Sequence, residues 1–161
     1  MNSDNRLLDI HQETVVPEWI DYNGHMNVAY YVLVFDHATD ALFDHVGIGE
    51  SYRNEHDSSL FVVESHITYD REVALGDPLR ITTQILDNDE KRLHFFHRMF
   101  HATEGYLAAT TELLSLHVDM KSRRTAPFPD EPLKKLEALK TDHLAVPKPE
   151  QAGRIIGIRK K

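Results

Sequence analysis

The hydrophobic positions between residues 27 and 46 recur with the spacing of one helical face. Apolar side chains stand at positions 28, 31, 32, 35, 38, 42 and 46, so intervals of three and four dominate. Asn27 is a favourable N-cap and Gly47 a favourable C-terminal stop. The β-branched and aromatic run over residues 30–35 is also typical of a strand, but the periodic pattern is too long for one. We therefore predict a helix from Asn27 to about Val46.

Before and after this segment the pattern has the period of strands. A β-rich run in residues 7–19 should end at Pro17, because proline removes a ladder donor. Residues 59–70 alternate between apolar and polar side chains, as expected of a strand with one face buried. The apolar face is expected to carry Phe61, Val63, Ile67 and Tyr69.

The second half of the chain predicts an antiparallel meander. Its strands are expected at residues 77–86, 91–100 and 106–120, joined by the polar turns "DNDE" and "ATEG". A short amphipathic helix follows over residues 131–140, and then a basic tail that is mobile or packed on a partner. We predict one α+β domain over residues 1–161, with its core in about 8–120 and the C-terminal helix and tail in about 121–161.

Composition excludes several classes of protein. The chain has 161 residues, 41% of them hydrophobic, and no apolar run approaches the ~18 residues of a membrane span. Its N-terminus lacks a signal pattern, so we expect a cytoplasmic protein without membrane contacts. The absence of Cys excludes disulfides and a Cys nucleophile. A net charge of −8 without a basic stripe argues against nucleic-acid binding.

Motifs for cofactors and metals are also missing. The sequence has no G-x-S-x-G elbow, no G-x-G-x-x-G and no P-loop, so no cofactor is expected. Most of the eleven His should lie at the surface. On one strand His94 and His97 face opposite sides, whereas His97 and His101 stand about 13 Å apart. We therefore expect no metal site.

Asp21 stands directly before the predicted helix. It lies three residues ahead of Gly24, and Gly permits a tight turn and close approach of a ligand to the backbone. A helix N-terminus directs free N–H groups and partial positive charge outward. Such a donor beside a carboxylate suits hydrolysis of an activated ester. The alternative is that Asp21 and Asn27 only cap turns.

The segment "DYNGHMN", followed by an aromatic-rich helix, resembles the 4-hydroxybenzoyl-CoA thioesterase-like family of acyl-CoA thioesterases. The likeness continues through "VVESHITYDREVALGDPLRITTQI", so it covers about residues 8–120. It implies a hotdog fold, in which a curved antiparallel sheet wraps round one long helix. It also implies a dimer or higher homo-oligomer with active sites between subunits.

The resemblance also implies roles for individual residues. The acidic residue three before the Gly is the catalytic carboxylate, here Asp21, and the amide that holds the thioester oxygen falls at about Val28. His25 and Asn27 become site-shaping residues. Gly24 and Glu64, the glutamate of the second strand, contribute to substrate binding. Asp21 either attacks the carbonyl or deprotonates a water, and the sequence does not distinguish these roles.

Four short motifs, "PEWIDYNGHM", "DHATDAL", "VESHI" and "DEKRLHFFH", are similar to a narrower subfamily, the betainyl-CoA thioesterases associated with L-carnitine dehydrogenase. That likeness implies hydrolysis of betainyl-CoA to betaine and CoA. A quaternary ammonium binds to aromatic faces, and Trp19, Tyr22, Tyr30 and Tyr31 are candidates. The same rings would also serve core packing or an aryl or fatty acyl pocket.

The phosphates of CoA require cations, and six basic residues are candidates, each with solvated surface charge as the alternative: Lys91, Arg92, Arg98, Lys121, Arg123 and Arg124. Three other functions stay open from the sequence. A hotdog hydratase would use His25 as its catalytic base. A non-catalytic domain would only bind acyl-CoA. A thioesterase for another acyl group would keep the mechanism and change the pocket.

Overall fold

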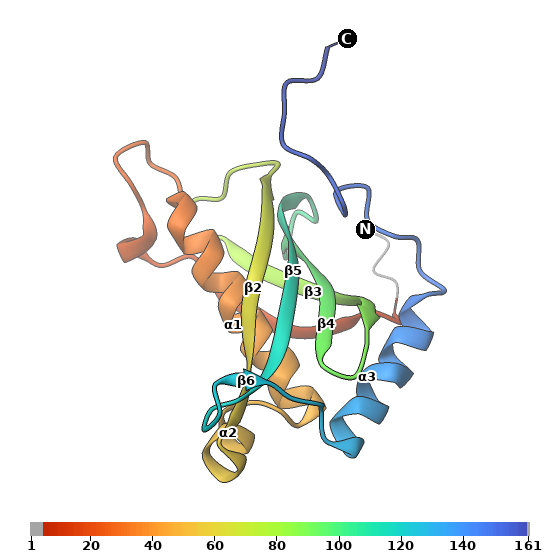
Figure 1. Cartoon of the computed structure of the whole chain (residues 1–161). Helices are drawn as coiled ribbons and strands as arrows, with labels where there is room; N and C mark the ends of the chain where they lie inside the picture. The colour runs from red at the N-terminus through yellow and green to blue at the C-terminus, as the bar shows by residue number, and fades with distance from the viewer. Residues whose placement is uncertain (1–4, 161) are drawn as a thin grey trace.

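A computed structural model describes residues 5–160, and within them one curved antiparallel sheet wraps round the long helix α1 (Val28–Val46) (Figure 1). The strand order is β1-β3-β4-β5-β2, and β6 pairs with β5. This is the predicted hotdog architecture, and β3, β4 and β5 form the predicted meander. The strands are β1 (Leu8–Thr14), β2 (Ser58–Tyr69), β3 (Pro78–Asn88), β4 (Arg92–His101), β5 (Leu107–Asp119) and β6 (Arg124–Thr125).

The ends of α1 are fixed by the residues that the sequence predicts. The Asn27 side chain accepts a hydrogen bond from the Ala29 N–H at 3.0 Å. Gly47 ends the helix with φ +84°, a left-handed conformation that favours glycine. The predicted apolar face is correct except at its first turns, where Val28 and Val32 are 57% and 46% exposed. These two residues lie four apart on a stripe beside the buried one.

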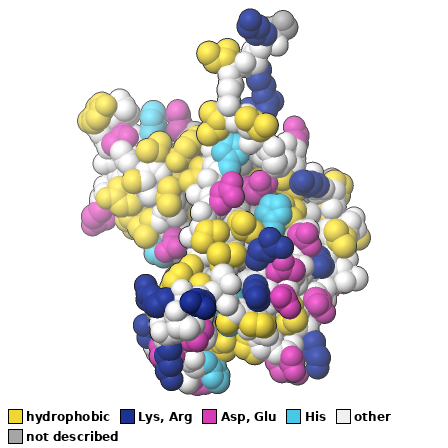
Figure 2. All heavy atoms as spheres, viewed as in Figure 1, with side chains coloured by type: hydrophobic (Ala, Val, Ile, Leu, Met, Phe, Trp, Pro, Cys, Tyr) yellow, Lys and Arg dark blue, Asp and Glu magenta, His cyan; other side chains and the backbone are white. Residues whose placement is uncertain are grey.

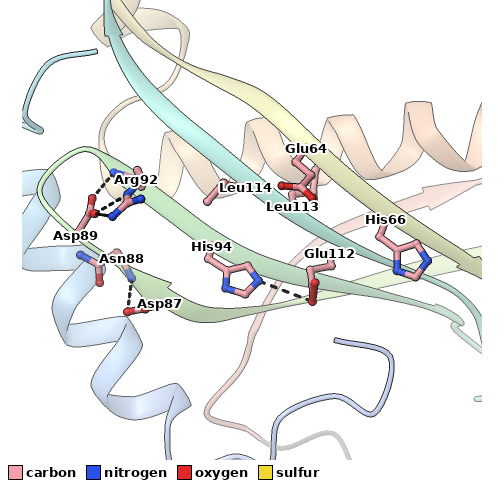
Figure 3. A pocket seen from close by; sticks show the side chains of 10 residues that line it. All are labelled: Glu64, His66, Asp87, Asn88, Asp89, Arg92, His94, Glu112, Leu113 and Leu114. Carbon is pink, nitrogen blue, oxygen red and sulfur yellow. Dashed lines mark hydrogen bonds and ion pairs between the residues drawn. The ribbon is translucent and has the colours of Figure 1, made fainter. Parts of the chain in front are cut away.

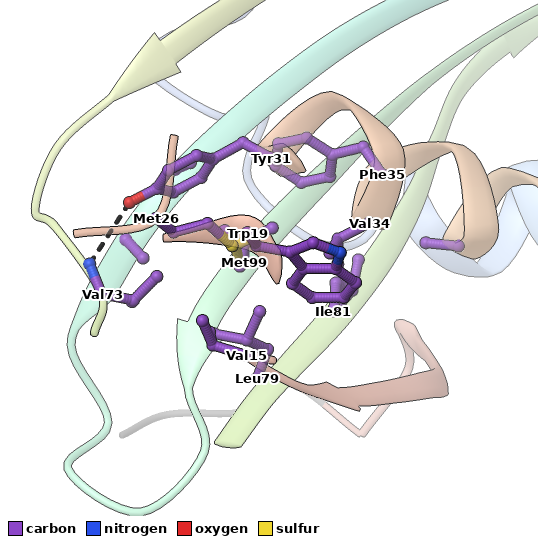
Figure 4. Packing of buried hydrophobic residues seen from close by; sticks show 13 residues of the cluster. Val15, Trp19, Met26, Tyr31, Val34, Phe35, Val73, Leu79, Ile81 and Met99 are labelled. Atoms are coloured by element: carbon purple, nitrogen blue, oxygen red, sulfur yellow. Dashed lines mark hydrogen bonds between the residues drawn. The ribbon is translucent and has the colours of Figure 1, made fainter. Parts of the chain in front are cut away.

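The core consists of two clusters under the two halves of α1. The first joins the N-terminal half of the helix to β3, β4 and the 3-10 turn η1 (Pro17–Trp19), and Figure 4 shows Trp19, Tyr31 and Phe35 within it. The second contains Leu42 and Phe95, and α3 (Asp130–His143) closes it with the fully buried Leu136. The core therefore holds α1 rigidly along its whole length.

The predicted buried face of β2 is wrong. Phe61, Val63 and Tyr69 are 36%, 53% and 49% exposed, and only Ile67 of that set packs against the core. The register shifts between Val62 and Glu64, which switches the alternation of the side chains. Because β2 pairs only with β5, it is an edge strand that presents apolar side chains to solvent.

Other differences lie in the connections. β1 ends at Thr14, and Pro17 begins η1 instead of ending a strand. The helix α2 (Glu50–His56) was not predicted, because it buries no residue and so has no apolar period. Seven of the eleven histidines are at least partly exposed, in line with the surface position expected of most, and four are buried: His97, His101, His117 and His143.

The end of the chain lies on the surface of the domain. The predicted C-terminal helix begins one residue earlier and extends to His143. The tail beyond it is exposed at Ile155, Ile156 and Ile158. Within the described residues, no helix combines the length and the apolar character needed to span a membrane.

Candidate active site

The loop between η1 and α1 is a closed turn that fixes Asp21. The Asp21 N–H donates to the His25 carbonyl at 3.0 Å, and the Gly24 N–H donates to the Asp21 carbonyl at 3.0 Å. Gly24 has φ +81°, which only glycine adopts without strain. The Asp21 carboxylate accepts the Asn23 N–H at 2.9 Å. The carboxylate therefore stands on a rigid turn directly before the helix.

The first turn of α1 leaves one donor unpaired. The Asn27 N–H bonds to the Trp19 carbonyl at 2.8 Å, and the Tyr30 N–H bonds to the Asn27 carbonyl at 3.0 Å. The Ala29 N–H is taken by the Asn27 side chain. Among residues 5–160, no hydrogen-bond partner is found for the Val28 N–H. This amide is the free donor of the helix N-terminus, where the partial positive charge is largest.

Asp21 and Val28 line one open depression of about 470 Å³ at this end of α1. His25 also lines it, and its Nε2 lies 3.5 Å from a carboxylate oxygen of Glu72. The structure therefore brings Asp21, His25 and the Val28 amide together, as the resemblance implies. The opposite wall comes from the end of β2 and the loop after it: Tyr69, Asp70, Arg71 and Glu72.

The predicted aromatic cluster is divided between the core and the surface. Trp19 is buried and stacks on Tyr30 with ring centroids 5.8 Å apart, so these two faces cover each other. Tyr31 is buried, and its hydroxyl accepts the Val73 N–H at 3.2 Å (Figure 4). Tyr22 is 97% exposed on the turn. Of the four predicted rings, only Tyr31 lines the depression.

Tyr69 is the aromatic residue of the site that the sequence analysis missed. Its ring meets Tyr31 edge to face at 5.3 Å, and its hydroxyl donates to the Val28 carbonyl at 3.4 Å. Burial raises the pKa of Tyr31 and of Tyr69, so both hydroxyls stay protonated near neutrality. The alternation in residues 59–70 assigned Tyr69 to the core. Only the packing of the β2 end against α1 reveals its position.

The structure places Glu64 away from Asp21. Glu64 lines a separate cavity of about 390 Å³ on the face of the sheet opposite α1, together with His66, His94 and Glu112 (Figure 3). Arg92, a candidate for CoA phosphates, lies in the same cavity and is held by Asp89 at 2.6 Å. Neither Glu64 nor Arg92 lines the depression of Asp21.

The other basic candidates lie outside the depression as well. The Arg98 guanidinium stands 5.8 Å from the Phe96 ring on β4, and Lys91 is in the β3–β4 turn. Lys121, Arg123 and Arg124 follow β5 at the end of the sheet where Ser58 pairs with Asp119. Tyr69 is eleven residues from Ser58 along β2, roughly 36 Å at about 3.3 Å per residue. Figure 2 shows Lys and Arg gathered at that distant end.

The sequence matches the model of one protein family, the thioesterase-like superfamily, over residues 15–136. It is 42% identical over 153 residues to a betainyl-CoA thioesterase of Pseudomonas aeruginosa, with 95% of this chain and 96% of that protein aligned. It is also 40% identical over 139 residues to the L-carnitine dehydrogenase/betainyl-CoA thioesterase of Rhizobium meliloti. That match covers 86% of this chain and 28% of the longer protein.

Solved structures show the same fold. A Staphylococcus aureus protein in complex with CoA superposes with a TM-score of 0.89 at 32% identity, covering 95% of this chain and 96% of that one. A putative thioesterase from Pseudomonas putida gives a TM-score of 0.83 at 37% identity, with 96% and 98% covered. These two likenesses extend over nearly the whole chain.

Proposed function

Because the chain belongs to the thioesterase-like superfamily and is a thioester hydrolase, we propose that it hydrolyses betainyl-CoA to betaine and CoA at the depression formed by Asp21 and Val28. The observation that carries this site is the unpaired Val28 N–H on the same depression as the Asp21 carboxylate. The relative from Pseudomonas aeruginosa, similar over nearly its whole length, supports the substrate.

The chemistry follows from these two groups. The thioester carbonyl oxygen accepts the Val28 N–H, which stabilises the negative charge that develops on this oxygen during attack. Asp21 either attacks the carbonyl carbon and forms an anhydride, or it removes a proton from an attacking water. In both cases the C–S bond breaks and CoA leaves as a thiolate that takes up a proton. On the first route water then hydrolyses the anhydride, which releases betaine and restores the Asp21 carboxylate. On the second route the attacking water itself supplies the new oxygen of betaine. His25 and Asn27 shape the site. The Asn27 side chain accepts the Ala29 N–H and leaves the Val28 N–H available to the substrate.

The charge of the depression suits a cationic acyl group. Asp21, Asp70 and Glu72 line it together with one cation, Arg71, so negative charge prevails among its carboxylate and guanidinium groups. Tyr69 adds a half-exposed ring. A trimethylammonium group gains from both, because it is attracted to aromatic faces and to carboxylates. Tyr69 thereby takes the role that the sequence analysis assigned to Trp19 and Tyr30.

We also propose that the active form is a dimer in the cytoplasm, joined along β2. The exposed apolar side chains of this edge include Phe61, Val62 and Val63, and α1 also exposes Val28 and Val32. Exposed apolar patches and unpaired edges favour association. A second copy on this surface would cover the depression and exclude water from the reacting carbonyl, which strengthens the field of the helix N-terminus.

Pairing of two β2 edges would also supply cations to the site. If two antiparallel copies of β2 pair along their full length, the Ser58 end of one lies beside the Tyr69 end of the other. The loop with Lys121, Arg123 and Arg124 of one copy would then approach the Asp21 depression of its partner. We propose that these three residues bind the CoA phosphates across the interface.

The test is release of free CoA by wild type and Asp21→Asn, with Asp36→Asn as the matched control. Asp36 is an exposed carboxylate on α1. Asp21→Asn should lower kcat by at least about 10²-fold, the scale of a lost general base, while KM changes little. Near-native turnover of Asp21→Asn would overturn the site. Substrates are betainyl-CoA and tert-butylacetyl-CoA, its neutral isostere, and a preference for the latter would overturn the proposed substrate.

The dimer is tested separately by sedimentation velocity at micromolar concentration. Val62→Asp, on the exposed edge, should shift the protein to monomer and lower its activity together. A wild type that sediments as a monomer while fully active would contradict the assembly and leave the assignment of Asp21 intact.

A further inference from the structure

Three potential metal ligands meet between β1 and α1, outside the depression of Asp21. The His11 Nε2 lies 2.8 Å from a carboxylate oxygen of Glu13. The His37 Nδ1 lies 2.9 Å and 3.0 Å from the two oxygens of the same carboxylate. The ligand atoms of all three residues lie within 4.8 Å of one another.

The elements that carry these residues are rigid. His11 and Glu13 are two apart on β1, so they point to the same face, and they pair with Ile81 and Leu79 of β3. His37 stands in the middle of α1, which packs against β1. The side chains of His11 and Glu13 are 20% exposed and that of His37 is 38% exposed. The cluster is thus largely desolvated but open on one side to an incoming ion.

We propose that His11, Glu13 and His37 bind one divalent transition-metal ion of the Zn²⁺ class. Two imidazoles and one carboxylate are a donor set that Zn²⁺ accepts, and three protein ligands leave a fourth position for water. Tetrahedral ligands about 2.0–2.2 Å from the ion stand roughly 3.3–3.5 Å from each other. The present separations from Glu13 are 2.8–3.0 Å, so each would have to open by roughly half an ångström. The ring nitrogens of His11 and His37, which lie within 4.8 Å of each other, would have to adjust to the same spacing.

The surroundings favour a cation. Asp36 and Asp40, both exposed, flank His37 on α1 and add negative charge near the cluster. Glu13 alone balances only half of the charge of a divalent ion, so the neighbouring carboxylates reduce the remaining excess. Hydrogen bonds from ring N–H groups of His11 and His37 to Glu13 are the competing explanation, and that arrangement would take up no metal.

The ion would have a structural role. His37 is nine residues beyond Val28, roughly 14 Å along the helix axis at about 1.5 Å per residue. The ion would therefore not touch the thioester. It would join the edge strand β1 to the helix that carries the proposed oxyanion donor, and it would resist fraying of that edge.

The test uses the full chain without a His tag, and Zn²⁺ as the probe in isothermal titration calorimetry. We expect one Zn²⁺ per protomer and a rise of the melting temperature on binding, since an ion that binds the folded state stabilises it. His37→Asn and Glu13→Gln should weaken binding by more than the roughly 10–100-fold caused by losing an outer-shell partner. His94→Asn is the control, because His94 stands 3.7 Å from Glu112 as a single His–carboxylate pair.

Co²⁺ gives a second readout that needs only the wild type. Replacing Zn²⁺ by Co²⁺ should produce the intense visible absorption of a tetrahedral site. Absence of that absorption, or equal Zn²⁺ affinity in wild type and both ligand variants, would overturn the proposal. Loss of binding in His94→Asn alone would place the metal on the other face of the sheet and would overturn it as well.

Discussion

His97 should make the stability of this protein fall as the pH falls from 7 to 5. Its side chain is fully buried on β4 between two hydroxyls, Thr39 Oγ1 at 2.9 Å from Nε2 and Thr83 Oγ1 at 2.8 Å from Nδ1. The Thr39 hydroxyl already donates to the Phe35 carbonyl at 3.0 Å. It must therefore accept from Nε2–H, which leaves Nδ1 as the acceptor for Thr83. Protonation of Nδ1 would force the Thr83 hydroxyl to turn from donor to acceptor and would place a charge in the core.

The magnitude follows from the shift in pKa. Burial, with a smaller contribution from His11, lowers the pKa of His97 from 6.5 to about 3. Between these values the unfolded chain binds a proton that the folded chain does not, so stability is present above pH 6.5 and is lost as the pH falls towards 3. The loss is about 1.4 kcal/mol per pH unit, which gives about 2 kcal/mol between pH 7 and pH 5.

The assay is urea unfolding at pH 7, 6 and 5 and a fixed protein concentration, followed by the fluorescence of Trp19, the single tryptophan. His97→Gln removes the titrating group and keeps one donor and one acceptor. It should lower stability at pH 7 by roughly 1–3 kcal/mol through imperfect hydrogen bonding. It should also remove about 2 kcal/mol of the loss between pH 7 and 5. The exposed His45→Gln is the control. If wild type and His97→Gln lose equal stability between pH 7 and pH 5, the claim that His97 is neutral in the folded protein is refuted.

Two further substitutions test the helix and the core. Asn27→Ala removes the N-cap of α1 and should lower the free energy of unfolding by about 1 kcal/mol. The kcat for CoA release should also fall, because the Val28 amide is no longer held in place. An unchanged kcat would argue against the Val28 amide as the oxyanion donor. Leu42→Ala, at a fully buried site, should lower the free energy of unfolding in urea by about 2–5 kcal/mol. Val32→Ala, on the exposed stripe, should lower it much less. Equal losses of stability in the two variants would contradict the packing of α1.

Local signals were sufficient for α1 and for the meander. The period of three and four, the cap at Asn27 and the stop at Gly47 all lie within a few residues of the helix they define, so they can be read from the sequence. The short polar turns likewise determine the pairing of neighbouring strands. The helix α2 was missed because none of its residues is buried, and periodicity reports only burial.

The rest depended on contacts between distant parts of the chain. The exposed face of β2 could not be predicted, because the register shift between Val62 and Glu64 changes which side chains face the core. Tyr69 reaches the Val28 carbonyl across a separation of 41 residues. His11 and His37 meet through the packing of β1 on α1, whereas the sequence analysis sought metals among histidines close together in the chain. In each case the fold brings together residues that lie far apart in the sequence, and the local spacing of residue types does not predict such contacts.

The unpaired N–H of Val28 has a consequence for how such a protein can diversify. A main-chain donor is present with every side chain except that of proline, so other substitutions at position 28 and around the depression leave the N–H in place. Only the turn at Gly24 and the cap at Asn27 need to be kept to aim it. The surrounding walls, at Tyr69, Asp70 and Glu72, are then free to change with the acyl group. New substrate specificities can therefore evolve by substitution of the residues that line the depression, without passing through an inactive variant.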